Sequence, residues 1–200
     1  MPFLTPQVAD ERDALAGFLE QQCAQLRLSA LDLDDEAARR PLLPEGLSVA
    51  GLLVHTAQVI ASWLERVRVA PEPLPQDRLF ELGRELGLAD RFFSGAELPE
   101  DMTLHEILTA YDRATARIRP VVEGADPETR VPVPEAPWFP KDLESWSVRW
   151  VCHHLIAEVA RHAGHADLIR ESIDGEIAYS LNARAEGEPF DWDAYGRVRE

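Results

Sequence analysis

The chain has 200 residues, of which 46% are hydrophobic and 28% charged, and its formal net charge at pH 7 is −16. This length suits one domain, and the composition can build a sizeable core, unlike that of a disordered chain. So acidic a surface repels phosphate backbones and anionic lipid heads, which makes nucleic acid and membranes poor partners. We therefore expect a single domain over residues 1–200.

The first residues of the chain and its two cysteines indicate where in the cell the protein is expected. Residues 1–17 lack a basic region followed by an apolar core, so we expect no signal peptide. The sequence also has no apolar run of about eighteen residues that predicts a transmembrane helix. Cys23 and Cys152 lie far apart and in no CxxC pattern, which favours two buried thiols over a disulfide. We expect a cytoplasmic protein.

The first part of the chain predicts two long helices. The first covers about residues 5–28, with Thr5 as its N-cap, and an acidic helical turn and a Pro-broken loop follow. The second covers about residues 48–69, with Ser48 as its N-cap, and ends before the Pro-rich stretch APEPLPQ. His55 continues the apolar stripe of this second helix, so we expect it on the inward face.

A third long helix is predicted at about residues 103–122, after a shorter one at about residues 77–86. The segment at residues 70–102 is expected to cross the bundle between the second and third long helices. The stretch EGADPETRVPVPEAPWFPKD follows and contains five prolines. A loop of this length is usually functional or mobile.

A fourth long helix is predicted from near residue 145 to residue 174, with Gly175 as its stop signal. Apolar residues recur in it every three or four positions, which is the pattern of a bundle helix, and His162 occupies a position in this seam. Long helices without convincing strands predict an all-α fold. We expect an antiparallel four-helix bundle, with the tail at residues 176–200 packing on it.

A metal site is one interpretation of the fourth helix. Glu158 and His162 lie four residues apart, so both side chains can reach one point. A carboxylate and an imidazole are suitable ligands for zinc or a related divalent ion, and His55 on a separate inward stripe supplies a third. The alternative is a glutamate and a histidine that are hydrogen-bonded in the core. Against it stands the cost of burying a carboxylate without compensation.

Three stretches resemble helices of the DinB-like superfamily, and together they cover nearly the whole chain. They are ERDALAGFLEQQCAQL, LPEGLSVAGLLVHTAQVIASWL and, most specifically, WVCHHLIAEVARHAGHADLIRESIDG. In this superfamily, one histidine of the second helix and two ligands four residues apart on the last helix bind a divalent metal. The resemblance thus implies His55, Glu158 and His162 as ligands, with zinc expected and nickel, manganese or iron as alternatives. Many members carry a histidine where this chain has Glu158, but a His/Glu/His set is similar to that of mycothiol-dependent maleylpyruvate isomerases.

The resemblance also implies a chemistry. Three protein ligands leave an open coordination position, which is typical of a catalytic site. Because related proteins transfer mycothiol or bacillithiol to electrophiles, we expect a metal-dependent thiol S-transferase or thiol-assisted isomerase, with a thiol and an electrophile as partners. The pocket is expected to be closed by the Pro-rich loop around Trp138 and Phe139, or by the tail near Trp192. A metal-dependent hydrolase and a non-catalytic metal- or small-molecule-binding stress protein remain open alternatives.

His154 is the candidate catalytic residue. It precedes Glu158 by four residues, so it can orient a ligand, contact substrate or carry a proton. The alternative is a hydrogen-bonded packing residue. His165, three residues after His162, is expected to support the site or to pack between helices.

Four further residues carry weaker signals. His153 points away from His154 and is expected to be structural or exposed, and His105 is expected to be exposed. The roles of Arg161 and Asp167 stay open. Similar proteins often form pairs, so we expect a homodimer.

Overall fold

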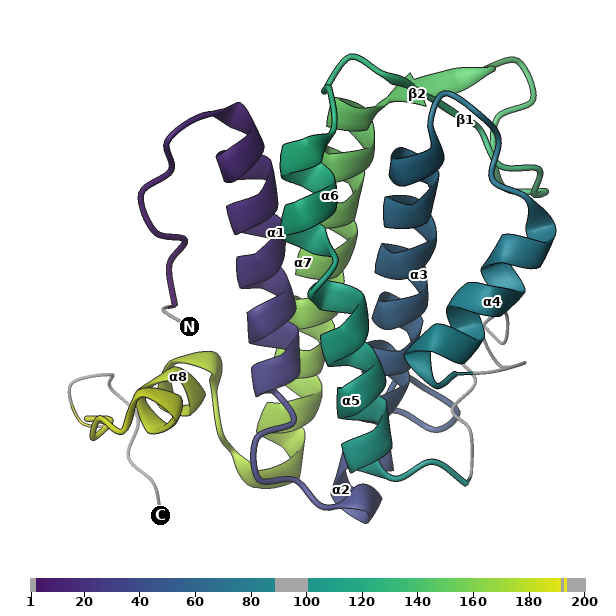
Figure 1. Ribbon diagram of the computed structural model, residues 1–200. Helices are drawn as coiled ribbons and strands as arrows, with labels where there is room; N and C mark the ends of the chain where they lie inside the picture. Colours follow the sequence, from purple (N-terminus) through teal and green to yellow (C-terminus); the bar gives the residue numbers. More distant parts are fainter. Residues whose placement is uncertain (1–2, 89–100, 192, 194–200) are drawn as a thin grey trace.

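The computed structural model describes residues 3–88, 101–191 and 193 (Figure 1). Nearly all regular structure in this part is helical, so the all-α prediction is confirmed. No helix of the described chain is both long and apolar enough to cross a bilayer. The elements are α1 (Glu11–Leu28), α2 (Asp35–Arg39), α3 (Val49–Val69), α4 (Gln76–Leu86), α5 (Leu104–Thr115), α6 (Ile118–Gly124), β1 (Arg130–Pro132), β2 (Ser145–Ser147), α7 (Val148–Asp174) and α8 (Ala178–Glu186).

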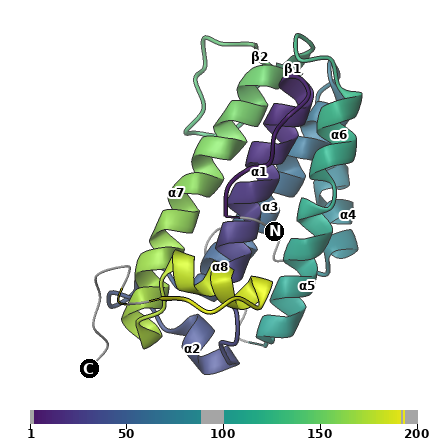
Figure 2. The same cartoon turned by 90° about the vertical axis from the view of Figure 1, so that its left-hand side faces the viewer.

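Four helical columns lie side by side around one cluster of buried apolar residues: α1, α3, α7, and α5 continued by α6 (Figures 1 and 2). Glu11 in α1 pairs with Arg149 at the start of α7, and Ser29 after α1 accepts a bond from Arg170 near the end of α7. These two helices therefore run parallel. Contacts place α6 antiparallel to α1 and α3 antiparallel to α7. Because α3 and α5 thus run the same way, the chain must cross back between them, and α4 forms part of that crossing.

Capping residues set the ends of the long helices. The first helix begins at Glu11, later than predicted, because the side chain of Asp10 rather than that of Thr5 accepts a backbone N–H of the first turn, at 3.0 Å. Ser48 caps α3 as predicted, with its hydroxyl 3.1 Å from a first-turn nitrogen. Gly175 ends α7 at φ 76°, a left-handed conformation that glycine adopts readily.

The third long helix is interrupted, which the sequence analysis did not predict. Helix α5 ends at Thr115 and α6 begins at Ile118. Pro120 accounts for the break, because it has no N–H to donate to the carbonyl of Ala116 and its ring would clash with that carbonyl in a continuous helix. In the first turn of the new helix α6 the same proline is tolerated.

A short antiparallel hairpin, also not predicted, brackets the Pro-rich loop. Val131 of β1 lies opposite Trp146 of β2, and Val131 is fully buried. Strand β2 continues directly into α7, whose first turn is capped by Ser147. The hairpin therefore fixes where α7 begins and where Trp146 lies.

A buried carboxylate ties α4 and α6 to α3. Glu65 is fully buried, and its Oε1 accepts bonds from Arg68 at 2.6 Å and from Arg78 of α4 at 2.8 Å. Its Oε2 pairs with Arg117, at the junction between α5 and α6. A buried charge needs partners, and here three guanidinium groups provide them.

The last described helix packs on the first. The side-chain amides of Gln25 in α1 and Asn182 in α8 exchange two hydrogen bonds, of 3.1 and 2.8 Å, and both residues are buried. Residues 192 and 194–200 lie outside the described part.

Candidate metal centre

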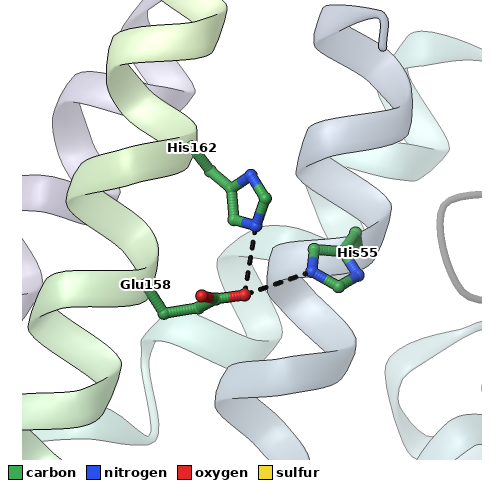
Figure 3. A group of neighbouring side chains, drawn as sticks. All are labelled: His55, Glu158 and His162. Carbon is green, nitrogen blue, oxygen red and sulfur yellow. Dashed lines mark hydrogen bonds and ion pairs between the residues drawn. The ribbon is translucent and has the colours of Figure 1, made fainter. Parts of the chain in front are cut away.

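Three side chains that can bind a metal meet between α3 and α7 (Figure 3). Nε2 of His162 lies 3.1 Å from Oε1 of Glu158, and Nε2 of His55 lies 3.5 Å from the same oxygen. One ligand atom from each residue lies within 4.8 Å of the others. The structure therefore brings together the three residues for which the sequence predicted a shared site.

Helix geometry positions this group. Glu158 and His162 are one turn apart on α7, and His55 faces them from the antiparallel helix α3. Leu52 and Leu155, both fully buried, belong to the apolar seams that hold the two helices together. The side chains of His55 and Glu158 are 26% and 27% exposed, so the group is half-buried and can be reached from solvent.

The pKa values of Glu158 and His162 favour the protonation states in which these two side chains bind a metal. Burial raises the pKa of Glu158, but the neighbouring imidazoles of His162 and His55 outweigh it, and the pKa lies below its ordinary value. Burial, together with the neighbouring His55 and His165, lowers the pKa of His162 by more than the adjacent carboxylate raises it. At neutral pH the pair is therefore a carboxylate beside a neutral imidazole. A metal binds these two groups in these forms.

Two of the three separations between ligand atoms, both to Oε1 of Glu158, fit a small divalent ion. Ligands about 2.1 Å from a tetrahedral ion lie about 3.4 Å from one another. The two distances to Glu158, 3.1 and 3.5 Å, bracket that separation. Two imidazole nitrogens and one carboxylate oxygen are also donors that suit zinc and its neighbours in the first transition row.

The outer side of His162 lacks an expected interaction. A histidine ligand usually donates its second ring N–H to a carboxylate, a carbonyl or water. Here Nδ1 of His162 is buried and has no hydrogen-bond partner in the described chain, and the same is true of Nδ1 of His165. The two rings lie 5.8 Å apart and tilted by 55°. His165 therefore packs beside His162 without hydrogen bonding to it.

A row of side chains leads along α7 to the candidate ligands. Trp150, His154, Glu158 and His162 follow one another at steps of four residues, which places them on one face of the helix. Trp146 of β2 precedes this row and stacks on its first member. The rings of Trp146 and Trp150 stack 4.2 Å apart, and those of Trp150 and His154 stack 5.1 Å apart with planes 13° from parallel. His154 thus links a group of aromatic rings to the candidate ligands.

Trp63 of α3 lies at the centre of these rings. Its centroid is 5.6 Å from that of His154 and 5.9 Å from that of Phe139, and both contacts are edge-on. Edge-to-face contacts of this kind are a preferred packing of aromatic rings. We refer to five residues as the aromatic cluster: Trp63, Phe139, Trp146, Trp150 and His154.

The Pro-rich loop reaches this cluster through one of its two aromatic residues. Phe139 packs against Trp63 and Trp146, whereas Trp138 is 78% exposed. Closure of a pocket by this loop stays a prediction. Trp192, the other aromatic residue expected to close the pocket, lies outside the described residues.

The remaining histidines lie away from the centre. His153 is exposed, and its Nδ1 lies 2.8 Å from the carbonyl oxygen of Arg149, to which it donates a hydrogen bond. His105 is exposed on α5, as predicted. Arg161 is exposed, and Asp167 is half-buried, where burial raises its pKa to about 6.

Neither cysteine is suited to act as a nucleophile. Cys23 and Cys152 are both free and buried, as the sequence predicted. Burial raises the pKa of Cys23 to about 12 and that of Cys152 to about 11. Because the thiolate is the reactive form, a thiol reaction at this site needs a thiol from outside the chain.

Part of the surroundings was not predicted from the sequence. Trp63, Trp146, Trp150 and Arg66 were not among the candidate site residues. A signal for Trp146 and Trp150 was present, because WSVRWVCHH places tryptophan, tryptophan and histidine at four-residue steps ahead of Glu158. Contact with Trp63 and Phe139 depends on tertiary packing and has no local signal.

The fold and the site define a class of protein. A helical bundle with a His/Glu/His group shared between the second and the last long helices is typical of the DinB-like superfamily, in agreement with the resemblance in the sequence. A family model described as mycothiol-S-transferase matches residues 14–175, which include all three candidate ligands. The chain belongs to this mycothiol S-transferase family, a member of the DinB-like superfamily. No curated protein and no solved structure matches the chain.

Proposed function

We propose that this protein transfers a low-molecular-weight thiol, mycothiol in the first place, to an electrophile. The observation that carries the proposal is the convergence of His55 and His162 on Glu158, at 3.5 and 3.1 Å, in a chain matched by the mycothiol S-transferase model. These three residues would hold a divalent ion, with zinc as the first candidate. Such an ion, when bound, lowers the pKa of a thiol ligand and so supplies a thiolate at neutral pH.

The charge of the three residues supports a thiolate rather than a neutral ligand. Glu158 contributes one negative charge and the two histidines contribute none in their neutral forms. With a divalent ion bound, the site therefore carries a net positive charge, which attracts an anionic ligand. In a half-buried site between apolar helices, neutralisation by a thiolate is favourable.

His154 is suited to take up the thiol proton. Burial is the main influence on this imidazole and lowers its pKa, so the ring is neutral at neutral pH. It lies one turn before Glu158, and neither ring nitrogen has a hydrogen-bond partner in the described chain or is sealed from water. In the proposed reaction the S–H proton passes to His154, the sulfur bonds to the electrophilic carbon, and the leaving group departs with its electron pair.

The test uses the zinc-loaded protein, mycothiol and 1-chloro-2,4-dinitrobenzene. The expected reaction forms a carbon–sulfur bond and breaks the carbon–chlorine bond, and the aryl thioether is followed by absorbance and mass spectrometry. His162→Ala should abolish the enzymatic rate, and His105→Ala, at an exposed position of α5, is the matched control. A wild-type rate no higher than the spontaneous rate, with this electrophile and with a panel of alkylating agents, would contradict the proposal.

Two further measurements on the zinc-loaded protein distinguish a hydrolase and a non-catalytic binding protein from a transferase. Hydrolysis of a panel of esters and amides by the zinc-loaded protein without any thiol would identify a hydrolase. Tight metal binding without either activity would identify a non-catalytic binding protein.

Pairing of two chains stays a prediction, to be checked by the mass in solution at micromolar concentration.

A further inference from the structure

Arg66 is a half-buried arginine of an acidic chain. Its neighbours Arg68 and Arg78 both pair with the carboxylate of Glu65. Arg66 has no ion pair within the described chain. Its Nη1 donates to the carbonyl of Ser62 at 3.0 Å, and its guanidinium carbon lies 5.8 Å from the ring centroid of Trp63.

One edge of this guanidinium is free to bind. Nη1 is taken by Ser62, whereas Nε and Nη2 have no hydrogen-bond partner in the described chain and are not sealed from water. These two nitrogens form the planar fork that matches both oxygens of a carboxylate. The group is half-buried, and burial lowers its pKa, although an arginine stays charged at any ordinary pH. A partly desolvated cation without a partner favours an anionic ligand.

Arg66 lies on the same face of α3 as His55, because eleven residues make close to three helical turns. Arg66 bonds one turn back to Ser62 and lies over the ring of Trp63, so its guanidinium lies about 12 Å along α3 from His55. Trp63 in turn contacts His154, which precedes Glu158 by one turn. The aromatic cluster therefore fills the interval between an unpaired cation at one end and the proposed sulfur position at the other.

We infer that Arg66 and the aromatic cluster form the electrophile subsite, and that the preferred electrophile is a planar, conjugated or aromatic molecule that carries a carboxylate. This inference rests on the proposed function and deepens it. The carboxylate pairs with Nε and Nη2 of Arg66, and the planar body lies against the aromatic rings, whose solvent-facing edge includes Trp150, 39% exposed. The carboxylate belongs to the electrophile because mycothiol, a neutral sugar conjugate, has none.

A binding experiment tests the subsite independently of catalysis. The zinc-loaded protein is titrated with 3,5-dinitrobenzoate and, separately, with 3,5-dinitrobenzamide, a neutral molecule of nearly the same shape. Binding is followed by quenching of tryptophan fluorescence. The wild type should bind the carboxylate at least about tenfold more tightly than the amide, because a charge-assisted pair is lost with the amide.

Arg66→Gln should remove this preference while it leaves the affinity for the amide within about twofold. Arg84→Gln, at an exposed position of α4, is the matched control and should keep the preference. His162→Ala should also keep it, which excludes capture of the carboxylate by the zinc ion. Unchanged amide binding in Arg66→Gln shows that the subsite is still folded. A wild type without the preference, or equal losses for both ligands in Arg66→Gln, would overturn the inference.

A matched pair of substrates then separates this inference from the proposed function. With mycothiol, the wild type should have a higher kcat/KM for 4-chloro-3,5-dinitrobenzoate than for the corresponding benzamide, and Arg66→Gln should lose that difference. Transfer to both substrates without any preference would contradict the subsite and leave the transferase proposal standing. Absence of transfer together with an Arg66-dependent binding preference would contradict the transferase proposal alone.

Discussion

His154 lies stacked on Trp150, with ring centroids 5.1 Å apart and planes 13° from parallel, and the edge of Trp63 holds it from the side at 5.6 Å. The two indoles fix the orientation of the imidazole. Its ring nitrogens have no hydrogen-bond partner in the described chain, so they stay available to a substrate.

Replacement of His154 should therefore separate catalysis from metal binding. His154→Ala is expected to reduce kcat for thiol transfer about 100-fold, the usual contribution of a general base, while the chain keeps its bound zinc. His153→Ala changes the adjacent exposed histidine and should leave kcat unchanged. Burial lowers the pKa of His154, so the wild-type rate should fall only as the pH drops through that lowered value, on the acid side of 6.5. A His154→Ala profile with the same acid limb would contradict the assignment.

The three candidate ligands should determine metal content. His162→Ala is expected to lose zinc, and Glu158→Gln to bind it more weakly, because a neutral amide is a poorer ligand than a carboxylate. Elemental analysis of dialysed protein measures the zinc per chain. Both variants should keep helical circular dichroism spectra, because buried apolar seams hold α3 and α7 together. Stoichiometric zinc in His162→Ala would mean that the metal binds elsewhere.

Glu65 should be among the most sensitive positions for stability. Glu65→Gln leaves the guanidinium groups of Arg68, Arg78 and Arg117 without their shared buried partner, and we expect the free energy of unfolding to fall by about 3 kcal/mol. Urea unfolding measures it. Glu81→Gln is the control, because this carboxylate is 55% exposed and forms an ion pair with Arg78 at 3.3 Å, and its loss should cost less than about 1 kcal/mol. Similar costs for the two variants would refute a central role for Glu65.

Asp167 should make the protein less stable as the pH rises. Burial raises its pKa from 3.8 to about 6 in the folded chain, so the folded state holds the proton more tightly than the unfolded state. Stability is then lost as the pH rises from about 4 to 6, by about 2 kcal/mol after allowance for partial exposure. Asp167→Asn should unfold at higher urea than the wild type at pH 8, and the two should converge at pH 4. Equal urea midpoints at pH 8 would show that burial of the ionised Asp167 does not destabilise the folded chain.

The sequence predicted those parts of the fold that local signals determine. Ser48 and Gly175 marked the ends of α3 and α7 because caps act within one turn. Thr5 was wrongly taken as the start of the first helix, since Asp10 offers an equally suitable cap closer to the apolar stripe. The break between α5 and α6 was missed because the apolar spacing continues across Pro120. The three-residue strands were too short to give a periodic signal.

The candidate site was predictable in one respect and not in another. The four-residue step from Glu158 to His162 and the inward position of His55 are visible in the sequence, and the resemblance to a family supplied the pairing between the two helices. The aromatic cluster depends on which face of α3 meets α7 and on the path of the Pro-rich loop to Phe139. Neither is encoded in local spacing, so the cluster and Arg66 became apparent only in three dimensions.

The most direct measurement is a crystal structure of the zinc-loaded protein with diffraction data on both sides of the zinc absorption edge. The proposal predicts one anomalous peak between α3 and α7, within about 2.3 Å of Nε2 of His55, Nε2 of His162 and a carboxylate oxygen of Glu158. In crystals grown with mycothiol, the thiol sulfur should lie at the remaining position of the same peak. No peak there, or a peak held by surface carboxylates alone, would contradict the metal centre and the function built on it.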